Sequence, residues 1–468
     1  MLYLQAYIFN DEKFIYFLKI WMIGFETIGN ATTTFFDDSE TVLSTDPWID
    51  GSPYFGSWLH RYNIPKEQKN NIINSKYIWY SHGHPDHLDE ESFKYLNNSC
   101  ILVPDHYGNR IYDYLRKKMN CIKLKSNSWF QISKNIKIKS FSDWNQDASI
   151  LVDILSKDIV FNQNDGKSLG WGPTIKNIVK NYKNRFLLKL TCWGDADMIN
   201  IYDNNNIFIK PYASLQPKVG EMYSSSMKNW NCNFSIPFSS LHQYVRTDSM
   251  TMNQFVTPLN RHKDGFDSSA GELLPAFIRW DSEKSYYEKI DPTLNKISPV
   301  SPESLGDSWS DVLEKEDKKL INDYFKKIEH LKDKIGTIIF NVGNKDFTIN
   351  FSRRKETIRF SAPKNSLVTA IKNEIFDDML IGNFMKTQLI NIKSLYPDFT
   401  PYVTKYADNG MAKNKMELNK YFKYYKLNSA DYWKDFFVSK TEAFVRKNFS
   451  AESLVYKASK IIHKKFVR

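Results

Sequence analysis

His82-Gly83-His84-Pro85-Asp86-His87 follows directly on Tyr77–Tyr80, an apolar segment rich in β-forming residues. Three of the nine histidines in the chain and one carboxylate therefore lie within a single short loop, where a strand is predicted to end. Imidazole and carboxylate groups are common ligands of Zn²⁺, Fe and Mn²⁺. The alternative, a polar loop with chance histidines, gives no reason for this clustering. The loop predicts a metalloenzyme.

The spacing of the loop suits one or two ions. Alternate residues of an extended segment point to the same side, so His82 and His84 can contact one ion together. Where the chain turns into a helix, Asp86 and His87 can face a second ion about 3.5–4 Å away. Two such ions activate a bridging water and polarise a substrate oxygen. We therefore expect one or two divalent ions, with Asp86 also placed to move protons.

The chain divides into four segments by pattern. Residues 1–21 are an N-terminal extension, and 22–262 alternate short β-like runs with helical stretches, which is typical of an α/β layered domain. Residues 263–311 are rich in Pro, Ser, Gly and Asp and are expected to connect two parts. Residues 312–468 predict a helix over 312–335, a three-strand meander, helices over 366–376 and 377–389, and a basic helical end. This last segment is a C-terminal α+β extension.

Composition limits the partners. With 468 residues, 42% hydrophobic and 15% aromatic, the chain is long enough for two or three folded domains. The net charge of +11 favours an anionic substrate or surface, although a solvated basic exterior is the simpler explanation. We find no nucleic-acid-binding motif and no apolar run long enough for an integral membrane segment. Four dispersed cysteines indicate a reducing, cytoplasmic setting and exclude a Rieske cluster within this chain.

A strand followed by H-x-H-x-D-H and a helix resembles the signature of the metallo-β-lactamase superfamily. The resemblance implies an αβ/βα sandwich with metals at one edge, His82 and His84 on the first metal, and Asp86 and His87 on the second. It also implies a bridging carboxylate, for which Asp165 fits because an apolar strand ends there before Gly166. An ordinary Asp-Gly turn is the alternative.

The last histidine of the family pattern corresponds to His242, which could equally bind substrate. The third histidine is absent, since the chain has none between His106 and His242. Asp143 or Asp147 would have to substitute for it. Zn²⁺ is the expected ion, but a more oxygen-rich site shifts the preference toward Fe or Mn.

Several segments are similar to the branch of that superfamily that contains CMP-N-acetylneuraminate hydroxylase and ascorbate-phosphate lactonase. They are Asp46–Gly51, Asn162–Asp165, Gly194–Asn200, Ser240–Asp248 and Ile381–Met385. The chain departs from the hydroxylase in having no Rieske module. The resemblance implies a hydrolase using metal-bound hydroxide on a sugar-phosphate, lactone or nucleotide-sugar-like anion. The alternatives are an iron monooxygenase component that hydroxylates an N-acyl sugar nucleotide with a separate redox partner, and a metal-binding protein without catalysis.

Four further residues are candidates for substrate binding. Arg246 and Tyr244 offer a clamp for phosphate or carboxylate, with a structural ion pair as the equal alternative. His106 follows a predicted strand and either borders the cleft or lies on the surface. Asp195 could bind metal, bind a sugar hydroxyl or cap a helix.

Overall fold

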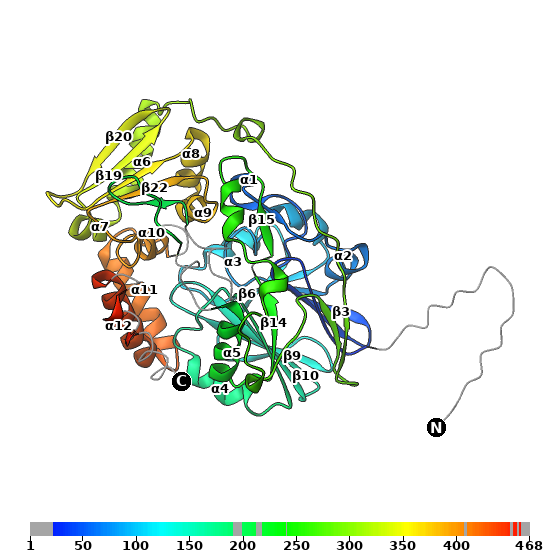
Figure 1. The fold of residues 1–468 in the computed structure, drawn as a ribbon. Helices are drawn as coiled ribbons and strands as arrows, with labels where there is room; N and C mark the ends of the chain where they lie inside the picture. The colour runs from blue at the N-terminus through cyan, green and yellow to red at the C-terminus, as the bar shows by residue number, and fades with distance from the viewer. Residues whose placement is uncertain are drawn as a thin grey trace, which may run out of the picture.

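The computed structural model describes residues 22–190, 199–211, 218–239, 241–406, 410–449, 453–455 and 458–459. Two large β-sheets pack face to face, and a smaller sheet with most of the remaining helices lies beside them (Figure 1). We call the first body the sandwich and the second the C-terminal part.

The first sheet has the order β18-β17-β1-β2-β3-β5-β6-β7. Its strands β3, β5, β6 and β7 run parallel, so their carboxyl ends lie at one edge. Helices α2 (Lys66–Ile73) and α3 (Arg110–Leu115) place Ile72 and Leu115 against the outer face of this sheet. The strands are β1 (Gly24–Ile28), β2 (Thr32–Asp37), β3 (Glu40–Thr45), β5 (Tyr77–Trp79), β6 (Cys100–Pro104), β7 (Cys121–Leu124), β17 (Ile278–Asp281) and β18 (Tyr286–Lys289).

The second sheet has the order β16-β14-β12-β11-β10-β9-β8. Every residue of its strands β10 and β11 is buried, as expected for strands covered on both faces. Helices α4 (Gly172–Val179) and α5 (Val219–Trp230) cover the outer face. The strands are β8 (Trp129–Gln131), β9 (Ile136–Ser142), β10 (Ala148–Ile154), β11 (Asp158–Asn164), β12 (Asn184–Leu190), β14 (Phe234–Phe238) and β16 (Glu272–Leu273).

The main core lies between the two sheets. Phe25 and Trp79 of the first sheet share it with Ile150, Val160 and Phe186 of the second. Burying such side chains contributes about 1.5–3 kcal/mol each. Helix, sheet, sheet and helix therefore form four layers, and the predicted αβ/βα sandwich is confirmed.

The C-terminal part is built on a sheet of order β13-β22-β21-β19-β20. Its strands are β13 (Ile201–Tyr202), β19 (Thr337–Val342), β20 (Lys345–Asn350), β21 (Thr357–Ser361) and β22 (Lys386–Ile390). Its helices are α6 (Lys315–Lys326), α7 (Glu329–Lys334), α8 (Lys364–Asn373), α9 (Phe376–Ile381), α10 (Thr400–Tyr406), α11 (Lys415–Asn428) and α12 (Tyr432–Asn448). The α+β character is as predicted.

Details of this part differ from prediction. The meander is wrong, because β19 pairs antiparallel with β20 but parallel with β21. The helix predicted over 312–335 is two helices, α6 and α7. The helix predicted over 377–389 ends at Ile381, since Asn383 is left-handed (φ 57°) and the chain continues as β22.

The segment boundaries also differ. The predicted connection 263–311 contains β16, β17 and β18, so the sandwich continues to Lys289. Ile278 and Trp280 of β17 belong to the main core, although Pro- and Ser-rich stretches surround this strand. Conversely, β13 comes from within 22–262 but pairs with β22 of the C-terminal part. The extension 1–21 lies outside the described residues.

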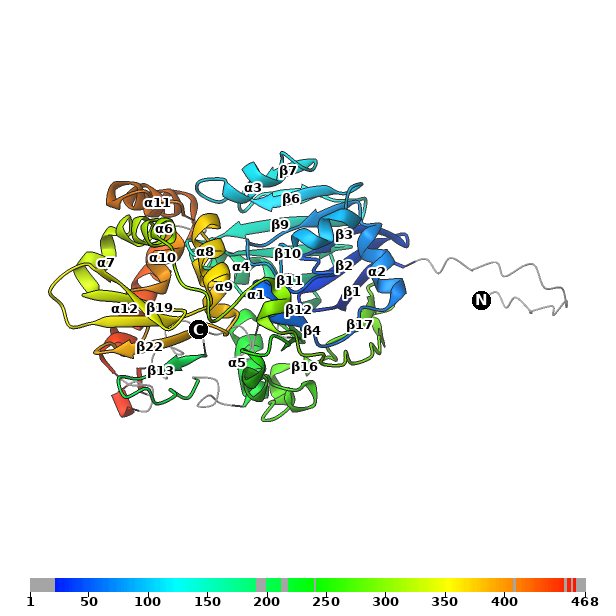
Figure 2. The ribbon, with the colours of Figure 1, turned by 90° about the horizontal axis from the view of Figure 1, so that it is seen from above.

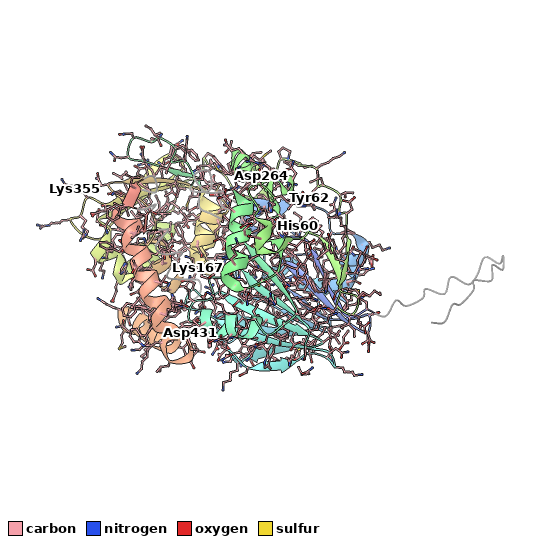
Figure 3. All side chains as sticks on the ribbon, turned by 60° about the horizontal axis from the view of Figure 1, so that its bottom comes forward. His60, Tyr62, Lys167, Asp264, Lys355 and Asp431 are labelled. Atoms are coloured by element: carbon pink, nitrogen blue, oxygen red, sulfur yellow. The ribbon has the colours of Figure 1, made fainter. Side chains whose placement is uncertain are left out.

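The C-terminal part contacts the sandwich at several places, two of which are near α1 (Pro53–Gly56) and near α4. Near α1, the Ser57 hydroxyl donates to the Gly382 carbonyl at 2.6 Å, and Figure 2 shows α9 beside α1. Near α4, Asp431 accepts hydrogen bonds from the Thr174 amide (3.1 Å) and hydroxyl (3.0 Å). Figure 3 shows Asp431 at this contact and Lys167 between the two parts. Within the described ranges, no helix is both long enough and apolar enough to cross a membrane.

Candidate metal centre

The ends of parallel strands carry the residues of the centre. Asp46 follows β3, His82 comes shortly after β5, His106 follows β6, Asp165 follows β11 and Ser239 follows β14. The carboxyl ends of parallel strands are where α/β proteins commonly bind ligands. The register of β11 and β12 also shifts between Asn162 and Asn164, directly before Asp165. Such irregularities redirect side chains next to functional sites.

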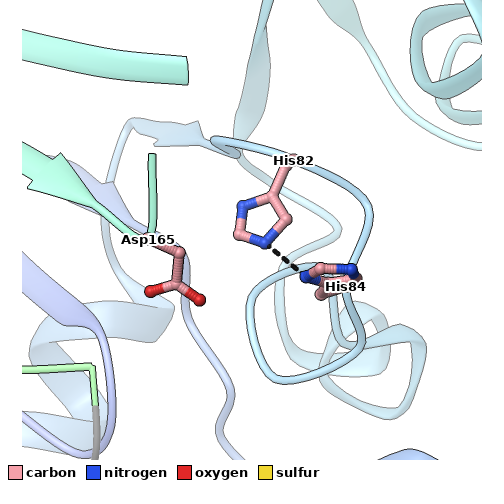
Figure 4. A group of neighbouring side chains, drawn as sticks. All are labelled: His82, His84 and Asp165. Atoms are coloured by element: carbon pink, nitrogen blue, oxygen red, sulfur yellow. Dashed lines mark hydrogen bonds between the residues drawn. The ribbon is translucent and has the colours of Figure 1, made fainter. Parts of the chain in front are cut away.

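His82, His84 and Asp165 converge. Nε2 of His82 lies 2.9 Å from Nδ1 of His84, and one ligand atom from each of the three residues lies within 4.8 Å of the others. In Figure 4 the two rings come from one loop, the carboxylate comes from the segment after β11, and all three face a shared space. The structure brings these three residues together, and their role as metal ligands stays a prediction. Two imidazole nitrogens and a carboxylate oxygen can hold one divalent ion.

His87 and Asp86 form a second group beside it. Nε2 of His87 lies 3.3 Å from Oδ2 of Asp86 and 3.3 Å from Oδ2 of Asp165. This nitrogen is fully buried and has no hydrogen-bond partner among the described residues. Its close contacts are therefore ion pairs with two carboxylates, and a bound divalent cation could take the place of the proton that pairs His87 with them. Asp165 thus contacts both groups, which is the place of a bridging carboxylate.

The outer atoms of the histidines are held by other side chains. Nδ1 of His82 lies 2.8 Å from the Ser81 hydroxyl, and Nδ1 of His87 lies 3.3 Å from Oδ2 of Asp46. The Asn164 amide links these supports, since it donates to Ser81 at 2.7 Å and also to Asp46. Metal-binding histidines commonly use their other nitrogen in this way, which fixes the ring.

The carboxylates are held in the same way. The Tyr54 hydroxyl donates to Oδ1 of Asp86 at 2.5 Å, and the Asn30 amide donates to Oδ2 at 2.9 Å. The Ser239 hydroxyl donates to Oδ1 of Asp165, leaving Oδ2 toward His87. The donor chemistry and the held outer atoms therefore fit a bound divalent cation.

Charge within the centre is balanced by close pairing. Burial disfavours protonation of His87, but Asp86 and Asp165 outweigh it and raise the pKa of His87 well above its usual value. Burial likewise opposes ionisation of Asp86, but His87 outweighs it and holds the Asp86 pKa below its usual value. Asp86 is therefore a carboxylate that accepts hydrogen bonds. Its predicted role in moving protons stays a prediction.

The two substitutes for the missing histidine differ. Asp143 closes the β9–β10 turn, where its carboxylate accepts from the Asn145 amide at 2.8 Å and the Leu169 amide at 3.3 Å. Asp147 is half-buried in the same turn. Burial raises the pKa of Asp147 to about 6. The negative charge of Asp165 adds to this rise, and the positive charges of the His84 and His87 rings oppose it. Asp147 is thus the freer carboxylate at the edge of the centre.

His242 lies in β15 (His242–Tyr244), which pairs with β4 (Trp58–His60). Its ring stacks on Trp58 with centroids 3.4 Å apart, and neither nitrogen has a hydrogen-bond partner among the described residues. Burial lowers the pKa of His242 to about 3 despite the opposing charge of Asp86. A neutral, unpaired imidazole near Asp86 suits a metal ligand.

Two of the predicted substrate-binding residues, Arg246 and Tyr244, are held by partners outside the predicted metal ligands. Arg246 is fully buried, and its guanidinium pairs with Asp248 (2.9 Å) and Asp307 (2.8 Å), which favours the structural ion pair. The Tyr244 hydroxyl accepts from the Asn383 amide at 2.9 Å. His106 is buried, with Nδ1 3.3 Å from the Tyr425 hydroxyl. Asp195 lies outside the described residues.

Sequence reasoning missed the contribution of α9. Asp377 and Asp378 form a second group with His84, with one ligand atom from each residue within 4.8 Å of the others. Two adjacent acids in the first turn of a helix were the available signal, but this pattern usually stabilises the helix end. The sequence also contained no sign that Tyr54, Asn30 and Asp46 support the ligands, because only the folded chain brings these residues to the loop.

Comparison with known proteins gives limited similarity. No protein-family model matches the chain. The chain is 23% identical over 136 residues to the cytidine monophosphate-N-acetylneuraminic acid hydroxylase of Asterias rubens. That match covers 27% of this chain and 19% of the relative, so the chain spans about a fifth of the relative's length.

Two solved structures are also similar. The isothiocyanate hydrolase from Delia radicum gut bacteria is 12% identical, with a TM-score of 0.35, over 54% of this chain and 95% of that chain. The diiron β-hydroxylase CmlA from Streptomyces venezuelae is 11% identical, with a TM-score of 0.36, over 56% of this chain and 54% of that chain. The layers observed here are those of an αβ/βα sandwich with a C-terminal α+β extension, and the histidine loop lies at the strand ends.

Proposed function

We propose that the protein is a metal-dependent hydrolase of the metallo-β-lactamase type. The proposal rests mainly on one observation: ligand atoms of His82, His84, His87 and Asp165 face inward, while the opposite atoms of these side chains are held by neighbours. In a polar cluster formed by chance, we would not expect the inward atoms to be left for a ligand while the outer atoms are held by neighbouring side chains.

In this proposal His82, His84 and Asp147 hold one cation, and Asp86, His87 and His242 hold a second, with Asp165 between them. A divalent ion bound there would supply Lewis acidity, which polarises a substrate oxygen and activates water. Tyr54 and Asn30 keep the Asp86 carboxylate oriented. Zn²⁺ is the expected ion for a hydrolase, and Fe or Mn suits the carboxylate-rich set.

We propose an anionic substrate because lysines lie beside the acidic centre. Lys167 is exposed two residues after Asp165, and its charge acts on Asp147. Lys189, at the end of β12, pairs in register with Asn164. Burial and the nearby charge of Lys167 lower the pKa of Lys189 to about 8. Two neighbouring amino groups favour a phosphate, carboxylate or lactone-derived anion.

The test is metal content per chain in His82→Ala, Asp165→Ala and the wild-type protein, purified without added chelator. We expect each substitution to remove at least part of one ion and to abolish hydrolysis of a panel of phosphodiesters, esters and lactones. His330→Ala, a histidine far along the chain in α7, serves as the control. Unchanged metal content and unchanged activity in both site variants would reject the proposal.

A second function, hydroxylation by an iron centre fed by a separate electron donor, is favoured by one observation. The proposed ligand set has the carboxylate of Asp147 in place of a third imidazole, because the chain has no histidine between His106 and His242, and an oxygen-rich set suits iron. The short match to a hydroxylase supports the same proposal. Protein purified anaerobically separates the two. Turnover without O₂ supports hydrolysis, whereas dependence on iron, O₂ and a reductant supports hydroxylation. Bound metal without turnover of either kind supports a binding protein.

A further inference from the structure

His84 presents its two ring nitrogens to different parts of the molecule. Nδ1 faces His82 and the space shared with Asp165, whereas Nε2 lies 3.5 Å from Oδ2 of Asp377. A histidine binds a metal through only one nitrogen when the other donates a proton. The inward position of Nδ1 makes it the ligand atom, and Nε2 is then the atom that needs an acceptor.

The support of His84 differs from that of the other ligands. The side chains that hold His82, His87, Asp165 and Asp86 all belong to the sandwich, and they are Ser81, Asp46, Ser239, Tyr54 and Asn30. Asp377 comes from α9, which lies 293 residues further along the chain. The C-terminal part therefore contributes a side chain to the centre.

The position of Asp377 is fixed by the packing of α9. Its side chain is 5% exposed, and the whole helix is buried. Directly after α9, the Gly382 carbonyl accepts from Ser57 at 2.6 Å, and Asn383 accepts from the Ile199 amide at 2.7 Å. These bonds join the end of α9 to the sandwich on the same side as α1. A carboxylate held this firmly can orient a ring that is itself half-buried.

We infer that Asp377 is a positioning residue, which keeps the proton of His84 on Nε2 and leaves the lone pair of Nδ1 for the metal. This inference rests on the proposed function, because it needs a cation at the His82–His84 pair. Carboxylates in this role typically change metal affinity by about 10- to 100-fold. Because such coupling is reciprocal, metal binding also stabilises the contact between α9 and the histidine loop.

The experiment measures metal affinity and stoichiometry in the full chain by competition with a chelator, using Zn²⁺ and Co²⁺ as probes. We expect Asp377→Ala to weaken binding of one ion by about 10- to 100-fold. Full stoichiometry should return at saturating metal. The visible spectrum of bound Co²⁺ should shift, and Asp377→Glu should recover part of the affinity. If the role of Asp377 were purely structural, Asp377→Ala would leave the Co²⁺ spectrum unchanged and Asp377→Glu would not recover metal affinity.

Asp307→Asn is the matched control, since Asp307 also joins the two parts through Arg246 but contacts no ligand. It should lower the stability of the metal-free protein and leave metal affinity unchanged. Equal affinity and equal spectra in wild type and Asp377→Ala would overturn this inference alone. Loss of a whole ion in Asp377→Ala would also overturn it, in favour of direct ligation by His84, Asp377 and Asp378. A wild-type chain that binds neither cation would overturn the proposed function itself.

Discussion

Tyr54 shows how one residue outside the histidine loop controls the centre. It is buried in α1 with a left-handed backbone (φ 55°), and its hydroxyl bonds to Asp86. Non-glycine residues in this conformation cost about 1–3 kcal/mol and persist where the surroundings hold them. The strain is consistent with a side chain whose direction matters, because the hydroxyl fixes one oxygen of the Asp86 carboxylate.

Replacing Tyr54 with Phe removes this hydrogen bond and keeps the ring on Trp58. We expect metal affinity to fall by about 10-fold, because the carboxylate loses one of its two supports. Competition with a chelator measures the change. Tyr244→Phe is the control, since it also removes a buried tyrosine hydroxyl, which accepts a hydrogen bond from Asn383. Equal affinities in wild type and Tyr54→Phe would show that Asn30 alone orients Asp86.

At the scale of elements, the local parts of the centre could be predicted and the distant parts could not. The strand Tyr77–Trp79, the histidine loop and the bend after β11 are short-range features with clear sequence patterns. Asp377 could not be predicted, because nothing in 376–381 indicates that α9 packs on α1. The turn to β22 was missed because Phe376, Met379, Leu380 and Phe384 recur at the three- to four-residue spacing of a helix.

The end of α9 depends on Asn383, which is fully buried and left-handed. Its side chain accepts from the Ile199 amide and donates to Tyr244. We expect Asn383→Ala to lower the free energy of unfolding by about 2–4 kcal/mol, because buried polar groups lose their partners. Asn383→Gly should cost about 1 kcal/mol less, since glycine tolerates this backbone.

Denaturant titration measures both variants of Asn383. The control is Asn391→Ala, an exposed residue with the same left-handed backbone (φ 59°). It should show the backbone cost without the loss of contacts between the two parts. If Asn391→Ala and Asn383→Ala are equally destabilised, the bonds of Asn383 contribute nothing measurable.

At the scale of the molecule, acid should weaken the fold through buried neutral histidines away from the centre. His262 is 2% exposed, and burial lowers its pKa to about 4. Unfolded histidine has a pKa of about 6.5, so between these values the unfolded chain binds the additional proton. The free energy of unfolding therefore falls as pH falls from about 6.5 to about 4, by up to about 3 kcal/mol from this residue.

His262→Gln tests this contribution. The variant should be less stable at pH 7, because the ring loses its contact with Tyr223. Its free energy of unfolding should nevertheless fall less steeply between pH 6.5 and pH 4 than that of the wild type. Parallel curves for the two proteins, measured by denaturant titration at each pH, would assign the acid sensitivity to other groups.

The pairing of β13 with β22 has a consequence for any attempt to divide this protein. Residues 201–202 leave the sandwich, complete one edge of the smaller sheet, and the chain then returns to form β14. A fragment beginning after Lys289 would carry β22 with a bare edge, which invites pairing with other chains. A fragment ending at Lys289 would keep β13 without its partner strand β22. A cut after Lys289 therefore does not leave two fragments that each keep a complete sheet.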